Sequence, residues 1–228
     1  MSYVVTLCLL LAVAGTSLAE RTIIMLKKNT VVSEEVFIHG GRDDGSAIPI
    51  SHVCDSSYAT SYNVWKVNDL KLDWGLEEKT QAIYKDPNRH NATYRPKGTP
   101  TWWTTSDPSN DAFHYANKFG EGYWIVELDM DCTVLPSGWF QMKGVQGDKD
   151  NWHHYYIGKY VGSVHTNEAL EGAQGWCDGS AGGKHPFSSD MLNHAGKCGK
   201  MNVFEWNKPG CLINEVPTQP SYYKCARC

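Results

Sequence analysis

Glu127, Asp129 and Asp131 are the residues whose types and spacing most directly suggest chemistry. They occupy every second position at the end of the stretch YWIVELDMD, residues 123–131. Carboxylates this close together could hold a calcium ion, act as an acid/base pair or line the solvated face of a sheet. The residues between them help to decide among these three roles.

The stretch alternates between two sets of side chains, as a β-strand does. One set is purely apolar and consists of Trp124, Val126, Leu128 and Met130. Because successive side chains of a strand point to opposite faces, this set predicts a core face and the acidic row predicts a solvated face. Calcium binds about six to eight oxygens, and a flat strand supplies few of them. A calcium site at Glu127, Asp129 and Asp131 therefore stays the alternative, and no catalytic residue is assigned.

A turn at Pro136–Gly138 and a second alternating run, Trp139–Val145, follow the acidic row. This order predicts an antiparallel hairpin. One register that fits a tight turn places Gln141 opposite Asp131 and Lys143 opposite Asp129. Lys143 would then partly neutralise the acidic row.

Tryptophan is frequent, with nine copies, and an exposed indole ring among polar side chains can stack on the flat face of a sugar. In TPTWWTT, Trp102 and Trp103 are neighbours, so an extended chain buries one ring and leaves the other exposed or half exposed. Burial of both rings is the alternative. The candidate ligand-binding residues are Trp102, Trp103, Trp65 and Trp74.

The first 19 residues have the pattern of a secretory signal peptide. A short apolar run precedes Ser17-Leu18-Ala19, a small-residue cleavage pattern. We therefore expect a secreted, extracellular protein that is cut near Ala19. The net charge of −4 argues against nucleic acid or an anionic membrane as partner. Asn91-Ala92-Thr93 is an acceptor sequence for N-glycosylation.

Cysteines in an oxidising compartment mostly form disulfides. Once Cys8 leaves with the signal peptide, the candidates are Cys54, Cys132, Cys177, Cys198, Cys211, Cys225 and Cys228. Their odd number leaves one thiol free or bonded to another chain. The pairing stays open at this point.

Short apolar runs separated by turn residues predict an all-β fold. They include residues 22–26, 36–38 and 47–50, and residues 62–74 are expected to hold one or two further strands. The predicted architecture is an immunoglobulin-like β-sandwich with long loops and little helix, spanning residues 20–207 and followed by a cysteine-containing tail, residues 208–228. Motifs of hydrolases, metalloproteases and nucleotide-binding enzymes are missing from the sequence, so we expect a non-enzyme without a cofactor.

Seven stretches, spread in order over residues 22–152 and 191–207, form a known pattern: VFIHGGRDD, AIPISH, LKLDWG, GTPTWWTT, GEGYWIVELDMDC, GWFQMKG and HAGKCGKMNVFEWN. The chain thereby resembles the accessory module C-terminal to the catalytic domain in some secreted α-amylases of bacteria and invertebrates. The segment from 153 to 187 is longer than that pattern, and the tail after Asn207 lies outside it. After the signal peptide 209 residues remain (228 − 19), too few to include an amylase barrel as well.

The resemblance implies a non-catalytic protein that binds a polysaccharide, with α-glucan favoured, or that assists an α-amylase or another extracellular protein. The alternative is a structural or interaction protein of an extracellular matrix or fluid, without sugar specificity. The odd cysteine, which permits an intermolecular disulfide, and the acidic row favour this alternative.

Overall fold

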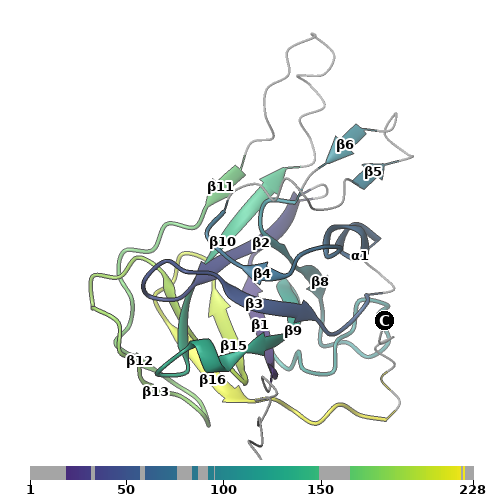
Figure 1. Ribbon diagram of the computed structural model, residues 1–228. Helices are drawn as coiled ribbons and strands as arrows, with labels where there is room; N and C mark the ends of the chain where they lie inside the picture. Colours follow the sequence, from purple (N-terminus) through teal and green to yellow (C-terminus); the bar gives the residue numbers. More distant parts are fainter. Residues whose placement is uncertain are drawn as a thin grey trace, which may run out of the picture.

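The structure, a computed structural model, describes residues 19–31, 34–56, 60–75, 84–86, 92–94, 96–148, 165–221 and 223. Strands dominate this part of the chain, which confirms the predicted all-β fold (Figure 1). The immunoglobulin-like arrangement stays a prediction. The predicted signal peptide before Ala19, Asn91, Cys225 and Cys228 lie outside the described residues.

The larger sheet has seven strands and contains the acidic stretch in its middle. Its order is β16 (Cys211–Glu215), β15 (Lys200–Glu205), β1 (Ala19–Lys27), β9 (Tyr123–Asp131), β3 (Ile48–His52) and β4 (Lys71–Leu72), with β8 (Trp102–Thr104) also paired to β9. β1 runs parallel to β15 and antiparallel to β9. The predicted tail from residue 208 thus contributes the edge strand β16.

The smaller sheet has five strands, and β2, β10 and β11 lie together in the upper part of Figure 1. Its order is β11 (His165–Asn167), β10 (Trp139–Asp148), β2 (Glu34–Gly41) and β7 (Thr99–Pro100), with β14 (His194–Lys197) also on β10. Two separate ribbons are β5 (Tyr84–Asp86) with β6 (Ala92–Tyr94), and β12 (Trp176–Cys177) with β13 (Gly183–Lys184).

Both large sheets contribute to one apolar core. Fully buried Val126 and Leu128 of β9 belong to the same cluster as Phe140 and Met142 of β10. Trp124 and Met130 are buried as well, so the predicted core face of the acidic stretch is confirmed.

The predicted hairpin between residues 123–131 and 139–145 is wrong. β9 already pairs with β1 on one side and with β3 and β8 on the other, so neither edge is open to β10. The chain leaves β9 through the short 3-10 helix η1 (Cys132–Val134) and enters the other sheet as β10. Lys143 therefore lies opposite His39 instead of Asp129.

Residues 62–74 contain one of the expected strands, β4, but their first part forms the helix α1 (Thr60–Trp65) instead of a strand. The buried aromatic residues Tyr62 and Trp65 are three positions apart, which is the spacing of one helical face. Tyr62 packs on Trp102 with ring centroids 4.5 Å apart, and Trp65 packs on Phe37 at 5.1 Å. Helical spacing of these anchors outweighs the strand propensity of the segment.

Disulfides connect segments that are distant in sequence. Cys132 bonds to Cys198, and Cys177 bonds to Cys211. Cys54 is disulfide-bonded as well. These bonds indicate an oxidising compartment. No helix in the described ranges has both the length and the apolarity needed to cross a membrane.

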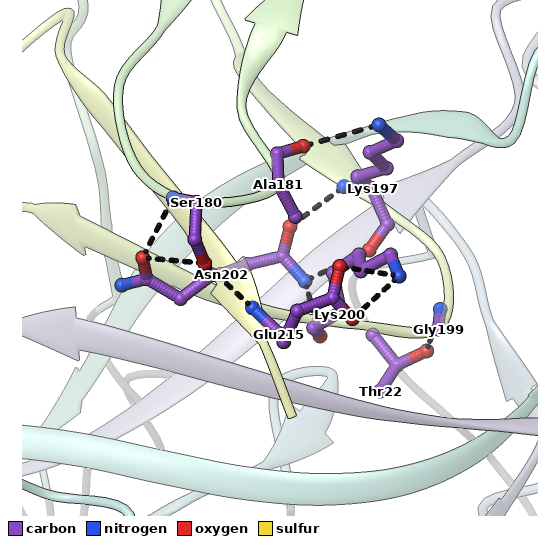
Figure 2. Close-up of polar contacts among 9 residues, drawn as sticks. Thr22, Ser180, Ala181, Lys197, Gly199, Lys200, Asn202 and Glu215 are labelled. Atoms are coloured by element: carbon purple, nitrogen blue, oxygen red, sulfur yellow. Dashed lines mark hydrogen bonds and ion pairs between the residues drawn. The ribbon is translucent and has the colours of Figure 1, made fainter. Parts of the chain in front are cut away.

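The buried side chain of Asn202 organises the turn that carries Cys198. Its Oδ1 accepts from Lys197 N at 2.6 Å, and its Nδ2 donates to the carbonyls of Lys197, Lys200 and Ile23 at 3.0, 2.9 and 3.2 Å. Figure 2 shows this amide between the two lysines at the ends of the turn. Gly199 at its tip has φ 71° and donates its N–H to Thr22 Oγ1 at 2.8 Å.

We expect Asn202→Ala to lower the free energy of unfolding by about 1–3 kcal/mol, because it leaves buried backbone groups without partners. Denaturant melts measure this loss. The control is Asn214→Ala, whose Oδ1 accepts only near the surface from Ser180, and it should cost less than about 1 kcal/mol. Equal losses for the two variants would contradict the organising role of Asn202.

Candidate functional site

The outer face of the five-stranded sheet is divided along its length into a covered and an open part. Opposed residues of β2 and β10 share a face, which gives the pairs Phe37–Val145, His39–Lys143 and Gly41–Gln141. Phe37 and Val145 are covered by Trp65 of α1, and the three form a separate buried cluster. The next two pairs lie beyond this cluster.

Trp74 lies over the last of these pairs. The backbone leading to it is fixed to β2 because Gly40 N donates to Asp73 O at 2.9 Å. A Cβ atom at position 41 would lie 2.9 Å from Trp74 Nε1 and 2.7 Å from Ser46 O. Glycine at position 41 thus allows the indole ring to approach the sheet backbone.

The result is a groove lined by His39, Trp74, Lys143, Asn167 and Asn193, which we call the Trp74 groove. Its volume is about 340 Å³, near the small end of the usual range for ligand sites, about 300–1,000 Å³. β2 and β10 supply the floor, and β11 and the chain before β14 supply the asparagines. Rigid strands thus position most of its side chains.

A chain of hydrogen bonds orients one of the two asparagines. Gln141 Nε2 donates to Asp43 Oδ1 at 2.6 Å, and Gln141 Oε1 accepts from Asn193 Nδ2 at 2.8 Å. This contact leaves the carboxamide oxygen of Asn193 available to a ligand donor. Asn167, at the exposed end of β11, offers a second carboxamide.

His39 contributes an uncharged ring to the groove. Burial lowers its pKa below the usual 6.5, although a bond to the Lys97 carbonyl and the charge of Asp73 oppose this shift. The Nε2–H group donates to Lys97 O, so Nδ1 remains as an acceptor. Together with the asparagines, the groove can both donate and accept hydrogen bonds beside an aromatic ring.

The four predicted tryptophans do not come together. Trp65 and Trp102 are 2% and 3% exposed, so neither ring can stack on a surface ligand, and both expectations are corrected. Trp103 is half-buried on β8 of the other sheet and packs against the core. The expected division between Trp102 and Trp103, one buried and one partly exposed, is therefore observed.

Of the groove residues, Trp74 was predicted from the sequence, whereas His39, Asn167 and Asn193 were not. Lys143 was predicted only as a partner for the acidic row. The one local signal for this site was the pair Gly40–Gly41 at the end of an apolar run, where a close approach to the backbone is possible.

The acidic row is not a uniformly solvated face, which corrects that prediction. Glu127 is fully buried; its Oε2 accepts from Arg21, and its Oε1 accepts from His114 Nε2 at 2.5 Å. Rings of Tyr115 and Tyr223 lie 4.8 and 5.2 Å from the His114 ring. Segments outside the sheet thus cover Glu127, and Arg21 takes the neutralising role expected of Lys143.

Asp129 and Asp131 are half-buried on the same face. Asp131 caps η1, since its Oδ1 accepts from Thr133 N at 3.0 Å. No group of three or more His, Cys, Asp or Glu side chains among the described residues is arranged to hold a metal ion. The alternative of calcium at Glu127, Asp129 and Asp131 is weakened further because Glu127 already has two partners.

We expect Asp129→Asn and Asp131→Asn each to change the free energy of unfolding by less than about 1 kcal/mol, since partly exposed charges contribute little. Denaturant melts with and without calcium test this. A calcium-dependent midpoint that either substitution removes would favour the metal site.

A second hollow, of about 250 Å³, lies beside His52 and Asp69. His52 Nε2 bonds to Asp69 at 2.8 Å, and its Nδ1 bonds to the Tyr62 hydroxyl at 2.7 Å. Both ring nitrogens are occupied, so this histidine offers no free base to a ligand.

Comparison of the chain with protein-family models, curated proteins and solved structures gives no match.

Proposed function

We propose that this chain is a secreted, non-catalytic protein that binds a polysaccharide through the Trp74 groove. The observation that carries the proposal is the position of Trp74, a half-buried indole ring at the wall of a polar groove with two asparagines and His39. The resemblance to amylase accessory modules favours an α-glucan as the polysaccharide and an α-amylase as the companion protein.

The chemistry of the groove fits a sugar ring. An indole ring gains from covering the apolar face of a pyranose, and carboxamides donate to and accept from adjacent hydroxyl groups. The disulfides Cys132–Cys198 and Cys177–Cys211 agree with an extracellular setting.

We expect Trp74→Ala to weaken retention on insoluble starch by about tenfold or more while the melting midpoint stays nearly unchanged. The stacking of a nucleic-acid base on one aromatic ring contributes on the order of 1–3 kcal/mol, and we expect a similar size for a sugar ring. The matched control is Trp103→Ala, which removes a half-buried ring on the other sheet and should reduce stability instead of binding. Chitin and cellulose complete the panel.

If wild-type protein is retained by none of these polysaccharides and binds no acidic oligosaccharide either, the binding proposal fails. Loss of binding in Trp103→Ala with intact binding in Trp74→Ala would move the site to the other sheet.

The second candidate function is an extracellular interaction protein without sugar specificity. The observation that favours it is Trp176 on β12, which is 58% exposed and does not line the Trp74 groove. The strands β12 and β13 lie at the lower left of Figure 1. An exposed ring of this size is a common anchor in protein interfaces. Failure of all glycan tests would make this the first candidate.

A further inference from the structure

Lys143 brings a positive charge to the Trp74 groove, and no carboxylate among the described residues forms an ion pair with it. Lys143 has no ion-pair partner among the described residues, whereas Lys66 pairs with Asp55 and Lys200 pairs with Glu215. None of the groove-lining residues is acidic. The positive charge of Lys143 is opposite in sign to the net charge of the protein, which is −4.

The other described titratable groups near Lys143 form no ion pair with it. The carboxylate of Asp43, the acidic group beside Gln141, accepts from Gln141 Nε2 at 2.6 Å. His39, directly opposite it on β2, has a lowered pKa and is neutral at pH 7. Asp73 acts on His39 electrostatically, but it does not line the groove and its Oδ1 accepts from Gly75 N at 2.8 Å. His165 on β11 is exposed and could only add positive charge.

The position of Lys143 makes it a ligand contact instead of a solvated surface charge. It lies on β10, in the middle of the sheet, between the covered Phe37–Val145 pair and the Gly41–Gln141 pair beneath Trp74. Its side chain is half-buried and lines the groove. The central strand β10 holds the base of this side chain in place. A partly desolvated ammonium group is stabilised more by an anionic partner than a fully exposed ammonium group is.

We infer that the Trp74 groove takes a sugar residue with an anionic substituent, a carboxylate or a sulfate, which lies against Lys143 while the ring of the sugar stacks on Trp74. The inference depends on the proposed glycan binding and specifies its ligand class. The carboxamides of Asn167 and Asn193 serve the remaining hydroxyl groups. A neutral glucan would leave the ammonium group without a partner.

The experiment measures binding of three tetrasaccharides by isothermal titration calorimetry: tetragalacturonate, a sulfated galactose tetrasaccharide and neutral maltotetraose. We expect an anionic tetrasaccharide to bind wild-type protein about tenfold or more tightly than maltotetraose, with the advantage decreasing as salt is raised. Lys143→Gln should remove the advantage, and Lys143→Arg should keep most of it. The matched control, Lys200→Gln, also removes one positive charge but at a distance from the groove, and it should bind as wild type does.

Preference for the uronate or for the sulfate supports the inference and identifies the group. Equal affinity for neutral and anionic ligands, unchanged in Lys143→Gln, overturns the inference and leaves the glycan-binding proposal intact. An advantage that Lys200→Gln loses equally would reflect overall charge and also overturns it. If none of the three ligands binds, both the inference and the proposed function fail.

Discussion

Glu127→Gln should lower the free energy of unfolding by about 3–5 kcal/mol, the usual cost of breaking a buried charge pair. The carboxylate of Glu127 is fully buried and uses its two oxygens for two donors, Arg21 and His114. A glutamine has the same shape but offers one oxygen, and its amide N–H groups would face the second donor. Urea melts of purified protein at pH 7 measure the loss.

The matched control for Glu127→Gln is Asp129→Asn, the same chemical change two residues along the same strand. Asp129 is half-buried, so this substitution should cost less than about 1 kcal/mol. Losses of equal size would show that the contacts of Glu127 with Arg21 and His114 add nothing to stability.

The protein should lose stability steadily as pH falls from about 6.5 toward 4, by about 1.4 kcal/mol per pH unit from His114 alone. Burial, with the Arg21 charge beside it, lowers the pKa of His114 from 6.5 to about 3. Its Nδ1 accepts from Ala116 N at 3.1 Å, so the neutral ring carries its proton on Nε2 and donates to Glu127. The unfolded chain therefore binds a proton below pH 6.5 that the folded chain excludes until about pH 3.

The groups that face His114 are Glu127, Arg21, Tyr115 and Tyr223. His39 has a lowered pKa as well, so it adds to the loss of stability per pH unit. The pKa of Glu168 is also lowered, and it contributes a further loss of stability only as pH falls below about 4.5.

The variant His114→Gln isolates the contribution of His114 to the pH dependence of the free energy of unfolding. It should be less stable at pH 7 but have a clearly shallower slope of unfolding free energy between pH 6.5 and 5. A slope that equals that of wild type would contradict the assignment, even if the variant is destabilised.

The all-β fold was predictable because strand alternation and turn residues are local. The core face of residues 123–131 followed from their apolar set alone. The partners of a strand are not local, however: β9 and β10 are adjacent in sequence, yet they pair in different sheets because β1, β3 and β8 occupy both edges of β9. The burial of Glu127 depends on His114, Tyr115 and Tyr223, which no pattern around Glu127 indicates.

The Trp74 groove was only partly predictable for a similar reason. Trp74 was identified from its residue type, but its partners are distributed over β2, β10, β11 and the chain before β14. The favoured pair Trp102 and Trp103 had more suggestive neighbours in sequence. The sheet nevertheless buries Trp102 against Tyr62 and His114 and holds Trp103 against the core. The groove residues come together through the register of β2 against β10, which places His39 opposite Lys143.

The most direct test of glycan binding at the Trp74 groove is a titration of ¹⁵N-labelled protein with a bound oligosaccharide from the calorimetric panel, followed by the side-chain N–H signals in NMR spectra. The tryptophan indole signals are assigned by single substitutions. We expect the largest shifts at Trp74 Nε1–H and at the carboxamides of Asn167 and Asn193, with the indole signals of Trp103 and Trp176 unchanged. Shifts centred on Trp103 or Trp176, with the signals of Trp74 and both asparagines unmoved, would contradict the assignment of ligand binding to the Trp74 groove.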